Sequence, residues 1–247
     1  LPTFLWLRER AEPQRLPQGV SYLKVAMVRL GNTFKAVRNY KEYIKFIVAF
    51  LIYNDGIMMA LDFAAIIGAT LFGMEQQQLI IFMIIVQITS VIGAYLFGII
   101  ADRSNGKIAL VISLILMIVA ILWMLVVDSL TVFYVSGGLA GFALTGVQSG
   151  SRAMVGQYAP EGKSAEFYGF FEVGGRASSF VGPTVYGFVA AEAALIYMNM
   201  GHDIIAAEQM GIRAAIISIA IFLVAGLIVL LWVKRPEEAK KTLQSEA

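Results

Sequence analysis

The stretch IKFIVAFLIYNDGIMMALDFAAIIGATLF, residues 44–72, decides the fold class because it is an apolar run long enough to cross a lipid bilayer. Asp55 lies about 16 Å into this run at 1.5 Å per residue, close to the middle of the membrane. A charged side chain at that depth costs roughly 2.5 to 3.5 kcal/mol on insertion scales, so such residues usually face a polar cavity and handle an ion or a substrate. The run therefore indicates a membrane transporter, with Asp55 as the first candidate site residue.

Five further apolar stretches extend the prediction to six membrane-spanning helices. The chain is 59% hydrophobic and 15% charged, whereas soluble domains carry about 25% charged residues. Short polar connections separate the stretches, except for a longer polar connection at residues 192–211. We predict an all-α membrane protein whose six-helix bundle covers residues 44–233, with spans at 44–72, 79–101, 108–127, 131–158, 167–191 (extendable by a turn or two) and 212–233.

The basic residues predict the orientation of this bundle, because basic loops stay on the cytoplasmic side. If the amino-terminal segment is cytoplasmic, sixteen of the nineteen lysines and arginines fall on its side, so both ends of the chain are expected there. Residues 1–7 look like the end of a preceding transmembrane helix, 8–43 a basic cytoplasmic linker, and 234–247 a cytoplasmic tail. Leu23, Met27, Leu30, Phe34 and Val37 predict an amphipathic helix in the linker, lying on the lipid surface or packed on a soluble partner domain.

Composition argues against several other kinds of site. The absence of cysteine and the single histidine, His202, exclude thiolate chemistry and a histidine-rich metal centre, so neither a metal nor a cofactor is expected. A net charge of +2 without basic and aromatic residues interleaved on a polar face argues against nucleic acid as a partner. Serines occur within the spans, but no nucleophile and base are paired in the sequence, so we do not expect an enzyme.

Polar residues within the first and fourth spans are candidates for binding a substrate or an ion. Asn54 adjoins Asp55, and Gln148 and Arg152, four residues apart, share one face of the fourth span. For Asp55 the alternative is a structural hydrogen bond to a neighbouring helix. For Arg152 the alternative is a side chain that extends to the membrane surface or fixes the helix in place.

The fifth span supplies a further candidate pair and the most easily bent backbone. Glu172 and Arg176 are four residues apart, an arrangement that favours an ion pair within the helix, either structural or functional. Gly182 and Pro183 weaken the helix because proline removes a backbone donor. We expect a bend there, either a fixed kink or a moving joint.

The loop after the second span, GIIADRSNGK at residues 98–107, resembles the inter-helix signature of the major facilitator superfamily, G-x-x-x-D-R-x-G-R-R/K. The chain has one extra residue between Arg103 and Gly106, and Lys-Ile where the signature has further basic residues. The resemblance implies a cytoplasmic gate, in which the aspartate approaches a helix amino terminus and the basic residues meet acids opposite. The alternative is a set of ordinary interfacial charges on a turn. The implied gate residues are Gly98, Asp102, Arg103, Gly106 and Lys107.

Other strings resemble the vacuole-effluxer-like group of that superfamily: YNDG at 53–56, GVQSGSR at 146–152, APEGKSAEFYGF at 159–170, and Gly182-Pro183. The chain is similar to the carboxy-terminal half of such twelve-span proteins. The resemblance implies that the first and fourth spans here line a central cavity. Asp55, Gln148 and Arg152 would then be cavity residues.

These observations together predict a secondary active transporter that moves a small polar solute by alternating access, coupled to protons or another ion. The resemblance alone implies export of amino acids. Expected partners are the lipid bilayer, the solute, protons and a missing amino-terminal six-helix half on the same or a separate chain. The membrane would be the inner or plasma membrane in a bacterium and a vacuolar-type membrane in a eukaryote. The alternative is a non-transporting membrane module or a half-transporter that assembles with a partner.

Overall fold

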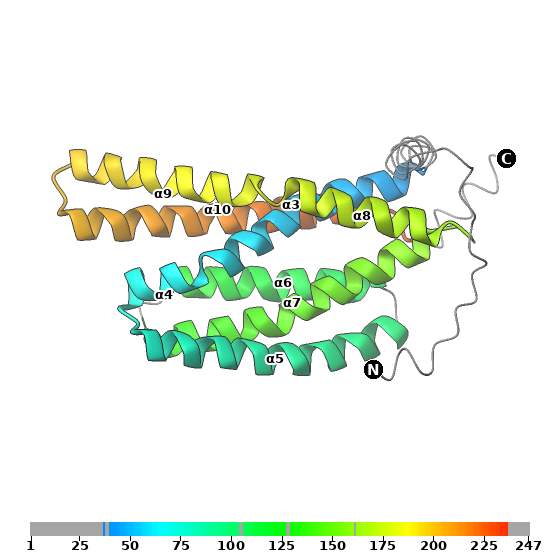
Figure 1. The fold of residues 1–247 in the computed structure, drawn as a ribbon, viewed down its shortest axis with the longest axis horizontal. Helices are drawn as coiled ribbons and strands as arrows, with labels where there is room; N and C mark the ends of the chain where they lie inside the picture. The colour runs from blue at the N-terminus through cyan, green and yellow to red at the C-terminus, as the bar shows by residue number, and fades with distance from the viewer. Residues whose placement is uncertain (1–36, 38–39, 104–105, 127–128, 161, 237–247) are drawn as a thin grey trace, which may run out of the picture.

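The computed structural model describes residue 37 and residues 40–103, 106–126, 129–160 and 162–236, and this part of the chain is helical without strands. The predicted helix at 23–37 lies almost wholly outside the described residues, as do the segment 1–7 and most of the tail. Figure 1 shows the helices lying side by side along the long axis of the molecule. They are α3 (Lys41–Asp62), α4 (Ala64–Phe72), α5 (Gln76–Arg103), α6 (Gly106–Val126), α7 (Leu130–Tyr158), α8 (Ser164–Ser178), α9 (Val181–Asn199) and α10 (Ile204–Trp232).

Six segments of the described chain are long and apolar enough to cross a membrane, so the prediction of an all-α bundle of six membrane-spanning helices is confirmed. The fourth span agrees with its predicted bounds to within one residue. The fifth span, Ser164–Asn199, runs about two turns beyond residue 191, as its expected extension allowed. The sixth span, Ile204–Trp232, begins earlier than predicted, so only residues 200–203 lie between the two. The expected long polar connection at 192–211 is therefore wrong. Two of its three acids, Glu192 and Glu208, lie on exposed faces of α9 and α10 and do not end these helices.

Two of the predicted spans are broken. The first span divides at Phe63, where α3 ends and α4 begins. The fifth span divides at Ser179 and Phe180, just before the Gly182-Pro183 pair that predicted a bend. Pro183 falls in the first turn of α9, where the missing N–H costs nothing. It leaves the Ser179 carbonyl without its usual donor four residues on, so the chain starts a new helix instead of continuing α8.

The helices pack in two groups of three, α5 with α6 and α7, and α3 with α9 and α10. Within the first group, Ser90 of α5 donates to the Gly141 carbonyl of α7 at 2.9 Å, and Thr145 of α7 donates to the Ser90 carbonyl at 3.0 Å. Glycines let the two backbones come this close, as in other membrane proteins. In Figure 1 α5 lies along the lower edge of the bundle, and α7 runs beside it on the left and rises toward α8 on the right.

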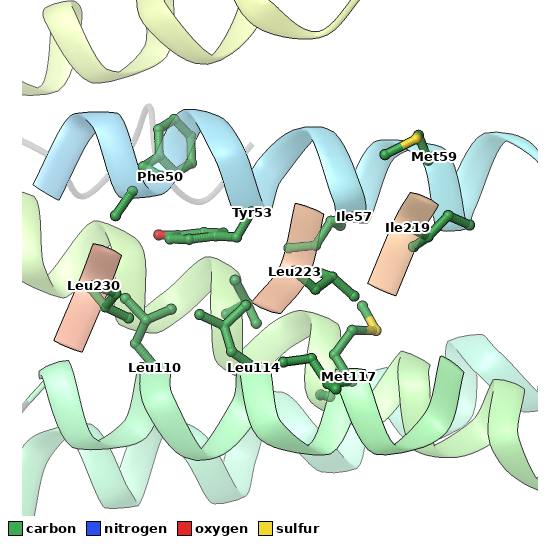
Figure 2. Packing of buried hydrophobic residues seen from close by; sticks show 14 of the residues in the cluster. Phe50, Tyr53, Ile57, Met59, Leu110, Leu114, Met117, Ile219, Leu223 and Leu230 are labelled. Carbon is green, nitrogen blue, oxygen red and sulfur yellow. The ribbon is translucent and has the colours of Figure 1, made fainter. Parts of the chain in front are cut away.

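The two groups meet where α10 packs on α6 and, over a smaller area, where α3 packs on α7. Figure 2 shows Tyr53 and Ile57 pointing from α3 toward the side chains of α6 and α10. Tyr53 is fully buried, and its hydroxyl forms a 2.7 Å hydrogen bond with Ser151 of α7. Because lipid tails are as apolar as leucine, close packing and such polar contacts hold the groups together. The residues drawn in Figure 2 include Phe50, Met59, Leu110, Leu114, Met117, Ile219, Leu223 and Leu230.

One end of the bundle carries most of its described basic residues. We call it the basic end; there α3, α6 and α8 begin and α5, α7 and α10 end, on the right in Figure 1. This is the end that the basic residues predict to be cytoplasmic. Its basic residues include Lys41, Lys45, Arg103, Lys107, Lys163, Lys234 and Arg235.

Candidate functional site

The Asp55 side chain is buried inside the bundle. Only 4% of the residue is exposed, and it is the one charged residue in the buried class within the described part of the chain. The Ser178 side chain at the end of α8 lies within hydrogen-bonding reach of the carboxyl group. The second carboxyl oxygen, Oδ1, has no hydrogen-bond partner among the described residues. An ionisable group is thus held away from lipid with only part of its hydrogen-bonding capacity satisfied.

The break in the fifth span positions this carboxyl group. A Cβ atom placed on Gly182 would lie 2.7 Å from the Asp55 carbonyl oxygen and 3.1 Å from the Asp55 Cβ atom. Only glycine therefore allows α9 to pack this closely on α3. Gly182 is near the middle of the span Ser164–Asn199, so Asp55 lies at mid-length of the bundle. This placement agrees with the depth predicted from its distance along the first span.

A second group of polar residues lies on exposed faces of α7 and α8. The side chains of Gln148, Arg152, Glu172 and Arg176 are all exposed. Arg152 Nη2 lies 3.6 Å from Glu172 Oε1, and Tyr168 of α8 donates to the Arg152 carbonyl at 2.9 Å. The expected ion pair between Glu172 and Arg176 does not form between these described residues. Instead, packing of α8 along the end of α7 brings Glu172 to Arg152, a contact that spacing within one helix could not reveal.

The predicted site residues therefore fall into two sets. Asp55 lies in the interface between α3 and the α8–α9 break, whereas Gln148 and Arg152 lie on an exposed face. Asn54 is half-buried beside Asp55. Ser178 and Tyr53 were missed as site residues, although Tyr53 belongs to the YNDG string and Ser178 comes just before the expected bend. No group of three or more acidic, histidine or cysteine side chains that could hold a metal ion occurs within the described ranges.

The predicted gate residues lie at the basic end with different surroundings. A Cβ atom on Gly98 would meet no atom within 4 Å, and Arg103 is exposed. Gly106 is buried, and a Cβ atom there would lie 3.2 Å from the Ala153 Cβ atom of α7. Asp102 is described only by its backbone position in α5. The gate role of these residues remains a prediction.

Lys107 makes the most specific contact of this set. Its ammonium group donates to the carbonyl oxygens of Leu231, at 3.2 Å, and Val233, at the end of α10. A cation at a helix carboxyl terminus satisfies free carbonyl groups and stabilises the helix dipole. The Glu42 carboxylate accepts the Lys234 N–H at 2.8 Å in the same region. Lys107 and Glu42 thus tie α6 and α3 to the end of α10.

Replacing Lys107 by Met is expected to lower the free energy of unfolding by about 1.5 to 3 kcal/mol, because the carbonyl groups of Leu231 and Val233 lose a charged donor. The measurement is thermal unfolding of the purified protein in detergent. The control is Lys163→Met, since Lys163 is exposed in the loop between α7 and α8. Equal melting temperatures for the two variants would show that the Lys107 contacts contribute nothing.

Comparison with known proteins identifies the family of this chain. The sequence model described as "Vacuole effluxer Atg22 like" matches residues 1–243, almost the whole chain. The chain belongs to the vacuole effluxer Atg22-like family. The resemblance drawn from the YNDG, GVQSGSR and APEGKSAEFYGF strings is thereby confirmed. Together with its six apolar spans, membership of this family makes the chain an integral, multi-pass membrane protein.

Curated relatives of the Atg22-like chain include proteins from bacteria and fungi. An uncharacterized MFS-type transporter, YxiO of Bacillus subtilis, is 24% identical over 88% of this chain and 46% of its own length. Autophagy-related protein 22 of Coccidioides immitis is 29% identical over 76% of this chain and 35% of its own length, and Autophagy-related protein 22-1 of Penicillium rubens is 27% identical over 76% and 36%. The chain thus spans between about a third and a half of the relatives that it matches.

Proposed function

We propose that this chain forms part of a secondary active transporter that moves a small polar solute across a membrane by alternating access, coupled to protons or another ion. The observation that carries the proposal is the buried Asp55 carboxyl group at a break in a membrane-spanning segment. Broken helices near the middle of the membrane are where transporters place substrate and ion sites. More specifically, we propose that the solute is an amino acid and that it is exported, on the basis of the family resemblance.

Asp55 has the properties of a coupling group. An ionised carboxylate that is buried without full hydrogen bonding is unfavourable in apolar surroundings. Uptake of a proton or a cation therefore lowers the free energy of the site. Ser178 lies beside the carboxyl group, but its hydroxyl donates to the Gly175 carbonyl at 3.3 Å, and Asp55 Oδ1 has no partner among the described residues. In the proposed cycle Asp55 takes up a coupling proton or cation on one side of the membrane and releases it on the other.

Gln148 and Arg152 have the properties of a solute-binding pair. They lie one helical turn apart on α7 and are exposed on the isolated bundle. The contact between Arg152 and Glu172 is 3.6 Å long, and both side chains are about half exposed or more. Exposed ion pairs contribute little, so Arg152 can exchange Glu172 for an anionic group of the solute at small cost. Arg176, also exposed on α8, extends this basic region.

A second six-helix half, on the same or a separate chain, is the proposed partner. Among the membrane-spanning segments, Gln76–Ala101 and Ser164–Asn199 are the least buried within this bundle. The chain spans less than half the length of these relatives. We propose that the exposed faces of these two segments pack against the remaining part of such a protein. Both ends of the bundle segment are proposed to be cytoplasmic. Absence of flux in any assay with the partner present would favour a non-transporting module.

The test is uptake of labelled solutes into proteoliposomes that contain the complete protein, with amino acids, sugars and nucleosides compared. For an anionic solute, Arg152→Gln is expected to raise KM by about tenfold or more, because one charged hydrogen bond is lost. Gln148→Ala should raise KM less. Arg235→Gln, an exposed basic residue at the basic end, is the control. No flux with any of the three solute classes, or equal KM values for Arg152→Gln and Arg235→Gln, would contradict the assignment.

A further inference from the structure

An apolar cavity lies inside the bundle, between the α3–α4 junction and the group formed by α5, α6 and α7. Residues of all five helices line about 590 Å³ of empty space, the mouth included. Protein interiors are close-packed, and voids larger than a water molecule are few. A space of this size therefore indicates a binding site, since pockets for small ligands typically measure about 300 to 1,000 Å³.

The cavity lies in the half of the bundle away from the basic end, on the left in Figure 1. On α6 its lining runs from Met117 to Met124, about 10 Å along the helix. Met124 is close to the end of α6 at Val126. Half of the hydrocarbon core of a bilayer is roughly 15 Å thick. The cavity therefore falls within a single leaflet of the membrane.

Small side chains on facing helices create the space. Ala60 near the end of α3 and Ala64 at the start of α4 line one wall, four residues apart in the sequence. Ala120 of α6 and Ala140 of α7 belong to the walls opposite. An alanine leaves room that a larger apolar residue would fill, so these helices enclose a space where their side chains do not meet.

The cavity opens beside Leu61. Among the described lining residues Leu61 is the one exposed side chain, at 41%, whereas those of α6 are all buried. The floor is thus formed by α6, and the mouth lies on the side of α3 and α4. Ile66, on the following turn of α4, is also exposed and apolar. An occupant therefore enters past apolar surface of a membrane-spanning segment.

The lining has no free polar group to hold a polar solute. Among the described lining residues only Ser136 has a polar side chain, and its hydroxyl already donates to the Phe133 carbonyl at 3.0 Å. The two buried side-chain atoms without a partner in the described chain, on Asp55 and Tyr186, are not in the lining. Apolar cavities stay free of water and bind apolar molecules. The occupant must therefore be a hydrocarbon.

We propose that a hydrocarbon chain of a membrane phospholipid enters this cavity from the surrounding leaflet and fills it. The bilayer around the spans supplies such chains, and the flexible side chains of Met117 and Met124 adapt to an irregular apolar guest. In place, the chain packs between the α3–α4 junction and the floor on α6. The proposal goes beyond the transport proposed above, because it depends neither on Asp55 nor on a solute.

The test is photochemical labelling of the complete protein in liposomes by a phosphatidylcholine that carries a diazirine in the middle of one acyl chain. Mass spectrometry of the labelled peptides compares two faces of α6. Met117 and Ala120 of the floor are each 1% exposed, so a lipid chain reaches them only from within the cavity. Val119 and Leu122, exposed on the opposite face, report labelling by the bulk bilayer. Both faces are expected to be labelled in the wild type.

A variant that fills the cavity assigns the floor labelling to this site. Ala64→Leu is expected to lower the ratio of floor to outer-face labelling about tenfold or more, because the added side chain overpacks the space that the lipid chain needs. Ala69→Leu is the matched control, since Ala69 is exposed on the same helix and does not line the cavity. If Ala64→Leu does not fold, Ala140→Leu fills the cavity from the opposite wall.

Three results would overturn the proposal. The first is a wild-type protein labelled on the outer face of α6 but not on its floor. The second is an equal ratio in Ala64→Leu and Ala69→Leu. The third is loss of floor labelling in the presence of excess phenylalanine, which would assign the cavity to an apolar solute. Each of these results concerns labelling alone, so solute flux in the same liposomes tests the transporter function separately.

Discussion

Replacing Asp55 by Asn is expected to abolish accumulation of solute against its gradient in proteoliposomes while exchange of solute across the membrane continues. Asparagine has the shape of the protonated acid and keeps a partner for Ser178, but it cannot take up or release a proton or balance a cation. For one coupling proton per solute and a difference of one pH unit across the membrane, accumulation should fall from about tenfold to none. The measurement compares gradient-driven uptake with counterflow at equal pH on both sides.

Asp62→Asn is the matched control for this variant. Asp62 lies two turns farther along α3, seven residues after Asp55, and is exposed. It therefore changes the same charge on the same helix without changing the buried site. If Asp55→Asn and Asp62→Asn both keep full accumulation and its pH dependence, Asp55 is a structural residue and coupling occurs elsewhere.

The surroundings of Asp55 also explain how an acidic residue can lie within a membrane-spanning helix. Ser178 and the close approach of Gly182 hold the Asp55 side chain within protein rather than against lipid. Ser178 and Gly182 lie on either side of the break between α8 and α9, so the break is beside Asp55. The Gly182-Pro183 pair therefore does more than bend the span, since it shapes the surroundings of the acid.

Local sequence predicted the features that depend on composition and helical spacing. The apolar runs predicted the six spans, and the position of Asp55 along its run predicted a place near mid-length of the bundle, because length along a helix converts directly into distance. The Gly182-Pro183 pair predicted a bend within four residues of where α8 ends. Each of these features depends only on residues within one helix, and each is present in the structure.

Features that depend on two helices were beyond local sequence. Glu172 has Arg176 at a suitable spacing, yet it contacts Arg152 because α8 packs along the end of α7. Tyr186 carries no motif, and only packing against Phe63 shows that its hydroxyl is buried without a partner. Lys107 matched a signature that implied a gate, whereas its described contacts are with the end of α10. In each case the partner lies on another helix, and spacing within one helix does not encode it.

Gly93→Ala is expected to destabilise the fold by about 1 to 3 kcal/mol, because the added methyl group enters a tightly packed contact between α5 and α7. A Cβ atom at this position would lie 2.2 Å from the Phe142 carbonyl oxygen and 2.6 Å from Thr145 Oγ1. A backbone oxygen cannot turn aside as a side chain can, so the two helices must separate. The hydrogen bonds between Ser90 and α7 at 2.9 and 3.0 Å would lengthen with them.

Thermal unfolding in detergent measures the effect of Gly93→Ala, with Gly98→Ala as the matched control five residues later on α5. A Cβ atom on Gly98 meets nothing within 4 Å, so that variant is expected to be neutral or to stabilise the helix by up to about 1 kcal/mol. A Tm about 5 °C lower for Gly93→Ala than for Gly98→Ala is expected for a chain of this size. Similar values for the two variants would mean that α5 and α7 can move apart at little cost, and that they do not form the rigid pair against which a moving α8–α9 segment could work.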